Sequence, residues 1–210
     1  MIKINFLGDS ITEGALASSQ EKTFVSLVGK MLPCIARNYG ISATRIAKQH
    51  TPSPDPRFDL DFVQRVDDLT TDADFVVVFG GTNDYGHGDA PFGKMGNKTT
   101  ATFCGSVYML MKKLLKKFTK EQIIIIPPIH RVNEDNPYGE GNKTVPGRPL
   151  GEYRDVIIDT AKQFGVRLLD ITEEIGPAEG NPLIEDGLHP NDEGHLKIAK
   201  LICEYINKLI

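Results

Sequence analysis

The sequence has few cysteines, no long hydrophobic run and no large excess of either charge. Its three cysteines are odd in number and far apart, which excludes a disulfide framework and fits reduced thiols. The first residues are apolar over too short a stretch for a secretory signal or a membrane span, so we expect a cytoplasmic protein without stable membrane insertion. A net charge of −4 lacks the basic excess typical of nucleic-acid-binding proteins.

Signatures of cofactors and metals are also missing. No GxGxxG or GxxxxGK[ST] motif follows the first strand-like segment, and the chain has neither an HExxH motif nor a metal-binding cysteine pair. We therefore expect no cofactor and no metal ion. His195, although it lies near Asp186, His189 and Asp192 in the sequence, is expected to pack or cap near the start of the last helix.

Short β-rich runs alternate with amphipathic helical patterns, as in proteins built from repeated βα units. The length and the 40% hydrophobic content fit one domain over residues 1–210. The third and fourth apolar runs are nearly continuous, which is typical of central strands covered on both faces. The pattern predicts an α/β fold, a three-layer α/β/α sandwich around a five-stranded parallel sheet, with strands at 2–7, 35–39, 74–80, 122–127 and 166–170.

Apolar residues at helical spacing predict the faces that cover this sheet. A further helical pattern predicts one more helix over residues 58–69, and the last helix is expected over 192–209 with Asn191 or Asp192 as its N-cap. The expected buried faces are Phe24, Leu27, Val28 and Met31; Phe103, Val107, Leu110, Met111, Leu114 and Phe118; Tyr153, Val156, Ile157, Ala161 and Phe164; and Leu196, Ala199, Ile202, Ile206 and Leu209.

Polar, chemically active residues follow the expected strands. Sites in parallel sheets form outside the carboxyl ends of the strands. The first strand ends in "GDS", the second in "YG" and the third in "GGTND", while "DGLHP" precedes the last helix. These residues are therefore expected to meet at one edge of the sheet.

Three of them fit nucleophilic acyl transfer, which needs a hydroxyl, an imidazole and a carboxylate. Ser10 supplies the hydroxyl, His189 the general base and Asp186 the carboxylate that orients it. The Asp-x-x-His spacing lets one short loop hold the last two together, and Pro190 disfavours a helical backbone at His189. For the oxyanion, the candidates are the N–H groups of Ser10 and Gly40 and the side-chain amide of Asn83.

The four blocks "GDSITEG", "YG", "GGTND" and "DGLHP", in this order, resemble the signature blocks of the SGNH-hydrolase (GDSL esterase/lipase) family. This resemblance spans nearly the whole chain. It implies a flavodoxin-like fold and metal-independent hydrolysis of esters. It also implies Ser10 as nucleophile, Gly40 and Asn83 as oxyanion donors, His189 as general base and acid, and Asp186 as its partner.

The substrate is less defined by the sequence than the reaction. Residues 84–98 and 128–149 form long Gly-, Pro- and Asn-rich segments of the kind that line binding sites. Their polarity favours a small-molecule ester with a short acyl group on a polar leaving group, such as an acetylated sugar. A lysophospholipase or acyl-thioester hydrolase is the alternative, and a non-catalytic flavodoxin-like binding protein a further one.

Three other residues near the expected site are candidate substrate contacts. Asp9 is expected chiefly to brace the Ser10 turn, whereas His87 and His130 follow strands at the active edge. Whether the chain forms a homo-oligomer is left open.

Overall fold

The computed structural model describes residues 1–141, 143 and 146–210, and its centre is a five-stranded sheet in the order β2-β1-β3-β4-β5. All neighbouring strands pair in parallel. The strands are β1 (Ile2–Gly8), β2 (Cys34–Gly40), β3 (Phe75–Phe79), β4 (Ile123–Ile126) and β5 (Arg167–Leu168). The predicted five-stranded parallel sheet is confirmed, although β5 is shorter than the expected 166–170.

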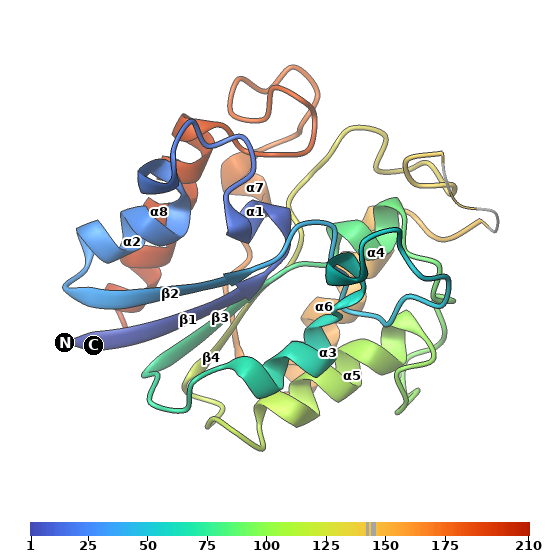
Figure 1. Cartoon of the computed structure of the whole chain (residues 1–210), viewed down its shortest axis with the longest axis horizontal. Helices are drawn as coiled ribbons and strands as arrows, with labels where there is room; N and C mark the ends of the chain where they lie inside the picture. Colours follow the sequence, from blue (N-terminus) through green and yellow to red (C-terminus); the bar gives the residue numbers. More distant parts are fainter. Residues whose placement is uncertain (142, 144–145) are drawn as a thin grey trace.

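Helices cover both faces of this sheet (Figure 1). One layer contains α2 (Phe24–Met31), α7 (Thr172–Ile175) and α8 (Asp192–Asn207), and the opposite layer contains α3 (Phe62–Arg65), α5 (Phe103–Leu114) and α6 (Leu150–Phe164). Two short helices, α1 (Ser10–Glu13) and α4 (Thr82–Gly86), follow β1 and β3 directly. The three-layer α/β/α architecture predicted from the sequence is therefore confirmed.

The central strands divide the hydrophobic core into two halves because successive side chains of a strand point to opposite faces. Val76 and Val78 of β3 pack with the α3, α5 and α6 side, while Val77 and Phe79 pack with the α2 and α8 side. Every residue of β3 and β4 is buried. This explains why both strands are nearly continuous apolar runs in the sequence.

Two details of the helix predictions are wrong. The helix expected over 58–69 is broken into a 3₁₀ turn at Pro56–Asp59, α3 and a second 3₁₀ turn at Val66–Asp68. The break occurs because Leu60 has a non-helical ψ of 86° and Asp61 starts α3 by accepting the N–H of Gln64 at 2.8 Å.

The second error concerns the direction of two side chains. Met31 and Leu196 were expected on buried faces, but they are 43% and 37% exposed. In α8, His195 and Ile198 fill the inner face instead. Asn191 caps this helix, as expected, by accepting the N–H of Gly194 at 3.1 Å.

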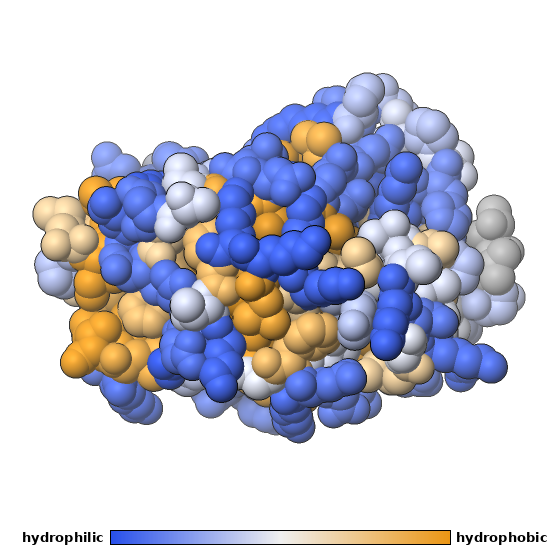
Figure 2. Space-filling view, turned by 90° about the horizontal axis from the view of Figure 1, so that it is seen from below, coloured by the Kyte–Doolittle hydropathy of each residue, from blue (hydrophilic) through white to orange (hydrophobic). Residues whose placement is uncertain are grey.

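Seen from below, the surface combines hydrophilic residues with hydrophobic ones that gather at the left and in the middle of the view (Figure 2). The lysines at the end of α5 are partly occupied by local contacts: Lys113 pairs with Asp67 at 2.8 Å, and Lys117 donates to the carbonyls of Val66, Asp67 and Leu69. Across the described part of the chain, no helix has both the length and the apolar character needed to cross a membrane.

Candidate active site

Ser10 occupies the first position of α1, immediately beyond the carboxyl end of β1. Gly8, the last residue of β1, packs so closely against its neighbours that there is no space for a side chain. A Cβ on Gly8 would lie 1.9 Å from Thr12 Oγ1 and 2.8 Å from the carbonyl oxygen of Phe79. Asp9 then caps the short helix, since its Oδ1 accepts the N–H of Ile11 at 3.1 Å. The turn thus places the serine at the edge of the sheet where the other candidates are expected.

The Ser10 hydroxyl meets the imidazole of His189, a residue 179 positions later in the chain. Ser10 Oγ lies 2.9 Å from His189 Nε2, and His189 Nδ1 lies 2.7 Å from Asp186 Oδ2. Because a carboxylate only accepts hydrogen bonds, Nδ1 carries a proton and Nε2 is left to accept from the serine when the ring is neutral. The structure brings the three residues together in the order that acyl transfer requires.

The loop before α8 fixes the orientation of the Asp186 carboxylate as well as that of the His189 imidazole. Asp186 Oδ1 accepts the N–H groups of Leu188 and His189 at 2.9 and 2.6 Å. Partial burial acts to raise the pKa of Asp186, but the hydrogen bonds from the His189 ring and from these two N–H groups outweigh it and hold the pKa below its usual value. The carboxylate therefore stays charged and oriented toward the imidazole.

Asn83 lies in α4, which begins directly after β3 and Gly81. Gly81 has a φ of 114°, a conformation that favours glycine. The side chain of Asn83 is buried, and its Nδ2 donates one hydrogen to the carbonyl of Thr44 at 3.0 Å. Within residues 1–141, 143 and 146–210, the second hydrogen of this amide has no acceptor. Asn83 therefore keeps one donor for a ligand.

The geometry does not support Gly40 as an oxyanion donor. Its N–H donates to Asn38 Oδ1 at 2.8 Å and is thus already paired. Glycine is needed there for a different reason: a Cβ would lie 2.2 Å from the backbone nitrogen of Glu13. Gly40 lets β2 pass close to the end of α1, and this close packing is its structural role.

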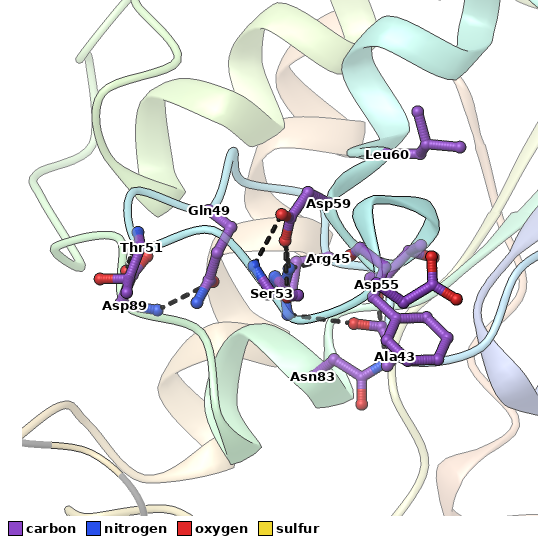
Figure 3. A network of polar contacts seen from close by, with 12 residues as sticks. Ala43, Arg45, Gln49, Thr51, Ser53, Asp55, Asp59, Leu60, Asn83 and Asp89 are labelled. Atoms are coloured by element: carbon purple, nitrogen blue, oxygen red, sulfur yellow. Dashed lines mark hydrogen bonds and ion pairs between the residues drawn. The ribbon is translucent and has the colours of Figure 1, made fainter.

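Ala43, which the sequence analysis missed, offers a donor in the same turn. It has a φ of 60°, unusual for a residue with a Cβ, and its N–H has no acceptor among the residues that the structure describes. Its neighbour Thr44 bonds to Asn83, and Figure 3 shows Ala43 beside Asn83. No sequence signal could have identified it, because a left-handed conformation is normally indicated by glycine or asparagine.

The candidate substrate contacts differ in their surroundings. Asp9 is only 1% exposed, and burial raises its pKa to about 6 against the hydrogen bond from Ile11 and the nearby charges of His189 and Arg65. In this conformation the Asp9 carboxylate braces the Ser10 turn and is not placed to meet a substrate. This agrees with the bracing expected from the sequence.

His87 lines a cavity of about 400 Å³, whereas His130 lies in the polar loop after β4. His87 Nδ1 is 3.2 Å from Arg45 Nη1, so this nitrogen accepts and Nε2 carries the proton. Burial lowers the pKa of His87, which keeps the ring neutral. His130 Nδ1 pairs with Glu134 at 2.9 Å, and the structure records no contact between His130 and Ser10, Asn83 or His189 in its described part.

His195 is fully buried and structural, as expected from the sequence. Its Nδ1 accepts the N–H of Phe24 at 3.2 Å, and its Nε2 donates to the carbonyl of Ala15 at 3.1 Å. Burial lowers its pKa, so the ring is neutral with the proton on Nε2. Among the described residues, no group of three or more His, Cys, Asp or Glu side chains could hold a metal ion.

Solved structures with the same fold cover nearly the whole chain. A protein from Lactobacillus plantarum is 27% identical with a TM-score of 0.81, over 99% of this chain and 97% of the other. A lipase/acylhydrolase from Enterococcus faecalis is 21% identical with a TM-score of 0.68, over 99% and 96%. Est24, a carbohydrate acetylesterase from Sinorhizobium meliloti, is 14% identical with a TM-score of 0.71, over 100% of both chains. No curated protein matches the sequence.

A family match gives the class of the protein, a hydrolase of the esterase or lipase class. The model of the GDSL-like Lipase/Acylhydrolase family matches residues 6–197, and the chain belongs to this family. The resemblance seen in the four sequence blocks is thereby confirmed.

Proposed function

We propose that the protein is a serine esterase that hydrolyses small carboxylic esters through an acyl-enzyme. The main support is the continuous chain of contacts from Ser10 Oγ through the His189 ring to Asp186, at 2.9 and 2.7 Å. His189 Nε2 takes the proton of Ser10 as its oxygen attacks the ester carbonyl. The protonated imidazole, stabilised by Asp186, then gives this proton to the leaving alcohol.

The negative charge that develops on the carbonyl oxygen needs preorganised donors. We assign this role to the N–H groups of Ser10 and Ala43 and to the free amide hydrogen of Asn83, with Ala43 in place of Gly40. Ser10 N–H is at the first turn of α1, where helix N–H groups have no intrahelical acceptor. In the second half of the reaction, His189 activates a water molecule that releases the acid from Ser10.

We further propose a short acyl group on a polar or carbohydrate leaving group. The cavity beside α4 supports this because it combines the aromatic ring of Phe92 with polar groups from Gln49, Asp89 and His87. The proton on His87 Nε2 is available there, since Nδ1 is occupied by Arg45. Several hydrogen-bonding groups around one cavity suit a polar, hydroxyl-bearing leaving group better than an alkyl chain. Est24, one of the structures with this fold, is a carbohydrate acetylesterase.

Turnover of nitrophenyl esters of graded acyl length tests both parts of the proposal. Ser10→Ala and His189→Ala should each lower kcat by roughly 10⁶-fold, as for a nucleophile and base that act as a unit. A fluorophosphonate should label the parent protein but not Ser10→Ala. Ser19→Ala is the matched control and should label normally, because Ser19 is exposed and its side chain makes no cap hydrogen bond.

Unchanged turnover by Ser10→Ala would contradict the serine mechanism. The acyl-chain preference is judged separately. Faster turnover of long-chain esters than of acetate would contradict the short-acyl assignment and favour a lysophospholipase-like activity instead.

A further inference from the structure

Arg65, the last residue of α3, is a buried cation at a junction of four chain segments. It is 3% exposed, and its guanidinium makes four hydrogen bonds. Nε donates to the carbonyl of Leu60 at 3.0 Å and Nη1 to the carbonyl of Tyr39 at 2.7 Å. Nη2 donates to the carbonyl of Gly8 at 3.0 Å and to Thr44 Oγ1 at 2.8 Å.

Arg65 Nη2 donates to one acceptor in each of the two turns that the proposed reaction needs, the turn before Ser10 and the turn that contains Ala43. Gly8 lies two residues before Ser10 and packs tightly against Thr12 of α1, the helix that Ser10 begins. Thr44 directly follows Ala43, and its carbonyl accepts the amide hydrogen of Asn83. A single nitrogen therefore connects the segment of the hydroxyl with the segment of the oxyanion donors, which are more than 30 positions apart in the chain.

The type of side chain matters at this junction. Only the planar guanidinium offers enough N–H donors, in a rigid arrangement, to reach all four acceptors. The ring of Phe62 covers it, with Arg65 Cζ 4.8 Å from the ring centroid. Burial lowers the pKa of Arg65 to about 10, so the group remains charged at neutral pH. A lysine at position 65 could reach only part of this set.

A second arginine fixes the same turn from its other side. Arg45 Nη1 donates to the carbonyl of Ala43 at 3.2 Å, and Arg45 Nη2 binds Asp59 at 3.1 Å (Figure 3). The carboxylate of Asp84, next to Asn83, accepts the N–H groups of Ile46 and Ala47. These contacts hold the turn against α4, but they do not reach β1.

Several contacts connect the turn that contains Ala43 to the Ser10 side. The Ile41 N–H donates to the Gly8 carbonyl at 3.1 Å, and Glu13 of α1 accepts the Ser42 N–H at 2.7 Å. Arg65 makes the contact that binds Thr44, the residue whose carbonyl holds Asn83.

We propose that Arg65 is a positioning residue for ester hydrolysis: by binding Gly8 and Thr44 together, it fixes Thr44, and with it Asn83 and Ala43, relative to the Ser10 oxygen. This inference rests on the proposed function. The effect acts on the transition state, because a substrate can bind before the oxyanion forms. Loss of the connection should therefore lower kcat more than it changes KM.

Steady-state hydrolysis of nitrophenyl acetate by Arg65→Lys is the first test. A displacement of about 1 Å at a reacting centre costs on the order of 10² in rate, so we expect kcat to fall by about 10²-fold with little change in KM. Arg37→Lys is the matched control. Arg37 also joins several segments through Asn5, Thr70 and Asp72 but contacts neither turn, so its kcat should stay at the parent value.

A second pair of variants tests the same connection if Arg65→Lys does not fold. Thr44→Val removes the hydroxyl that accepts from Arg65, whereas Thr44→Ser keeps it. We expect a lower kcat for the valine variant and near-parent turnover for the serine variant, with both folded by thermal melting.

The inference is overturned if folded Arg65→Lys keeps the parent kcat, if Arg37→Lys loses as much, or if the two Thr44 variants turn over equally. The proposed function fails by a different result, the retention of activity by Ser10→Ala. The two failures are therefore distinguishable.

Discussion

Replacing Asp9 with asparagine should make the free energy of unfolding less sensitive to pH, because Asp9 is a buried carboxyl group with only part of its hydrogen-bonding capacity satisfied. Its Oδ1 accepts the Ile11 N–H, but its buried Oδ2 has no hydrogen-bond partner among the described residues. Burial raises its pKa from 3.8 to about 6. Asp9→Asn keeps an acceptor for Ile11 and removes the titration.

The size of the effect follows from the two pKa values. A shift of one pKa unit corresponds to about 1.36 kcal/mol, so the rise to about 6 corresponds to about 3 kcal/mol. Between the two values the folded state binds more protons than the unfolded state, and the stability of the parent therefore decreases as the pH rises. The loss is absent below the unfolded pKa and complete above pH of about 6.

Urea unfolding at several pH values measures this difference directly. The free energy of unfolding of Asp9→Asn minus that of the parent should increase by about 3 kcal/mol from roughly pH 3 to roughly pH 8. Asp72→Asn is a control of opposite sign, since hydrogen bonds from Arg37 and Lys3 lower the pKa of exposed Asp72. A difference for Asp9→Asn that is flat with pH would refute the reasoning.

Three further substitutions test the local geometry. Gly8→Ala should lower the free energy of unfolding by about 1–3 kcal/mol and also lower kcat, because the added Cβ would meet Thr12 and Phe79. Denaturant unfolding measures the first effect, and parent-like values would show that the turn can relax. Ala43→Gly should raise stability by about 1 kcal/mol with turnover retained, because it relieves the positive φ and keeps the N–H; a loss of turnover would contradict this. His195→Ala should lower the free energy of unfolding by about 3 kcal/mol, since it leaves the buried Phe24 N–H and Ala15 carbonyl unpaired. An unchanged Tm in calorimetry would show that His195 does not stabilise the fold.

The arrangement of Ser10, His189 and Asp186 could be predicted because two of its determinants are local. The Asp-x-x-His segment forms its own loop, and Pro190 keeps His189 out of the helix. The third determinant is the parallel sheet, which brings the ends of β1 and β3 to one edge. Whether these residues catalyse ester hydrolysis remains a prediction for the experiments above.

Other predictions failed where a residue's role depends on distant partners. Gly40 follows its strand as an oxyanion donor would, but the side chain of Asn38 occupies its N–H. The helix expected over 58–69 has a helical apolar pattern, yet Asp61 starts a new helix within it, and Arg65 at the end of that helix is buried. Met31 and Leu196 have the spacing of buried residues, but the neighbouring elements leave them exposed.

Local patterns in the chain were sufficient to predict the parallel sheet, its central strands and the serine, histidine and carboxylate at its edge. Strand periodicity, turn residues and short loops are properties of neighbouring residues, so the sequence alone shows them. The backbone conformation of Ala43, the bonds of Arg65 to two turns and the burial of Asp9 depend on segments tens of residues apart. Such contacts form only when the sheet and its helices pack together, and the donors that we propose for the oxyanion therefore depend on the tertiary structure.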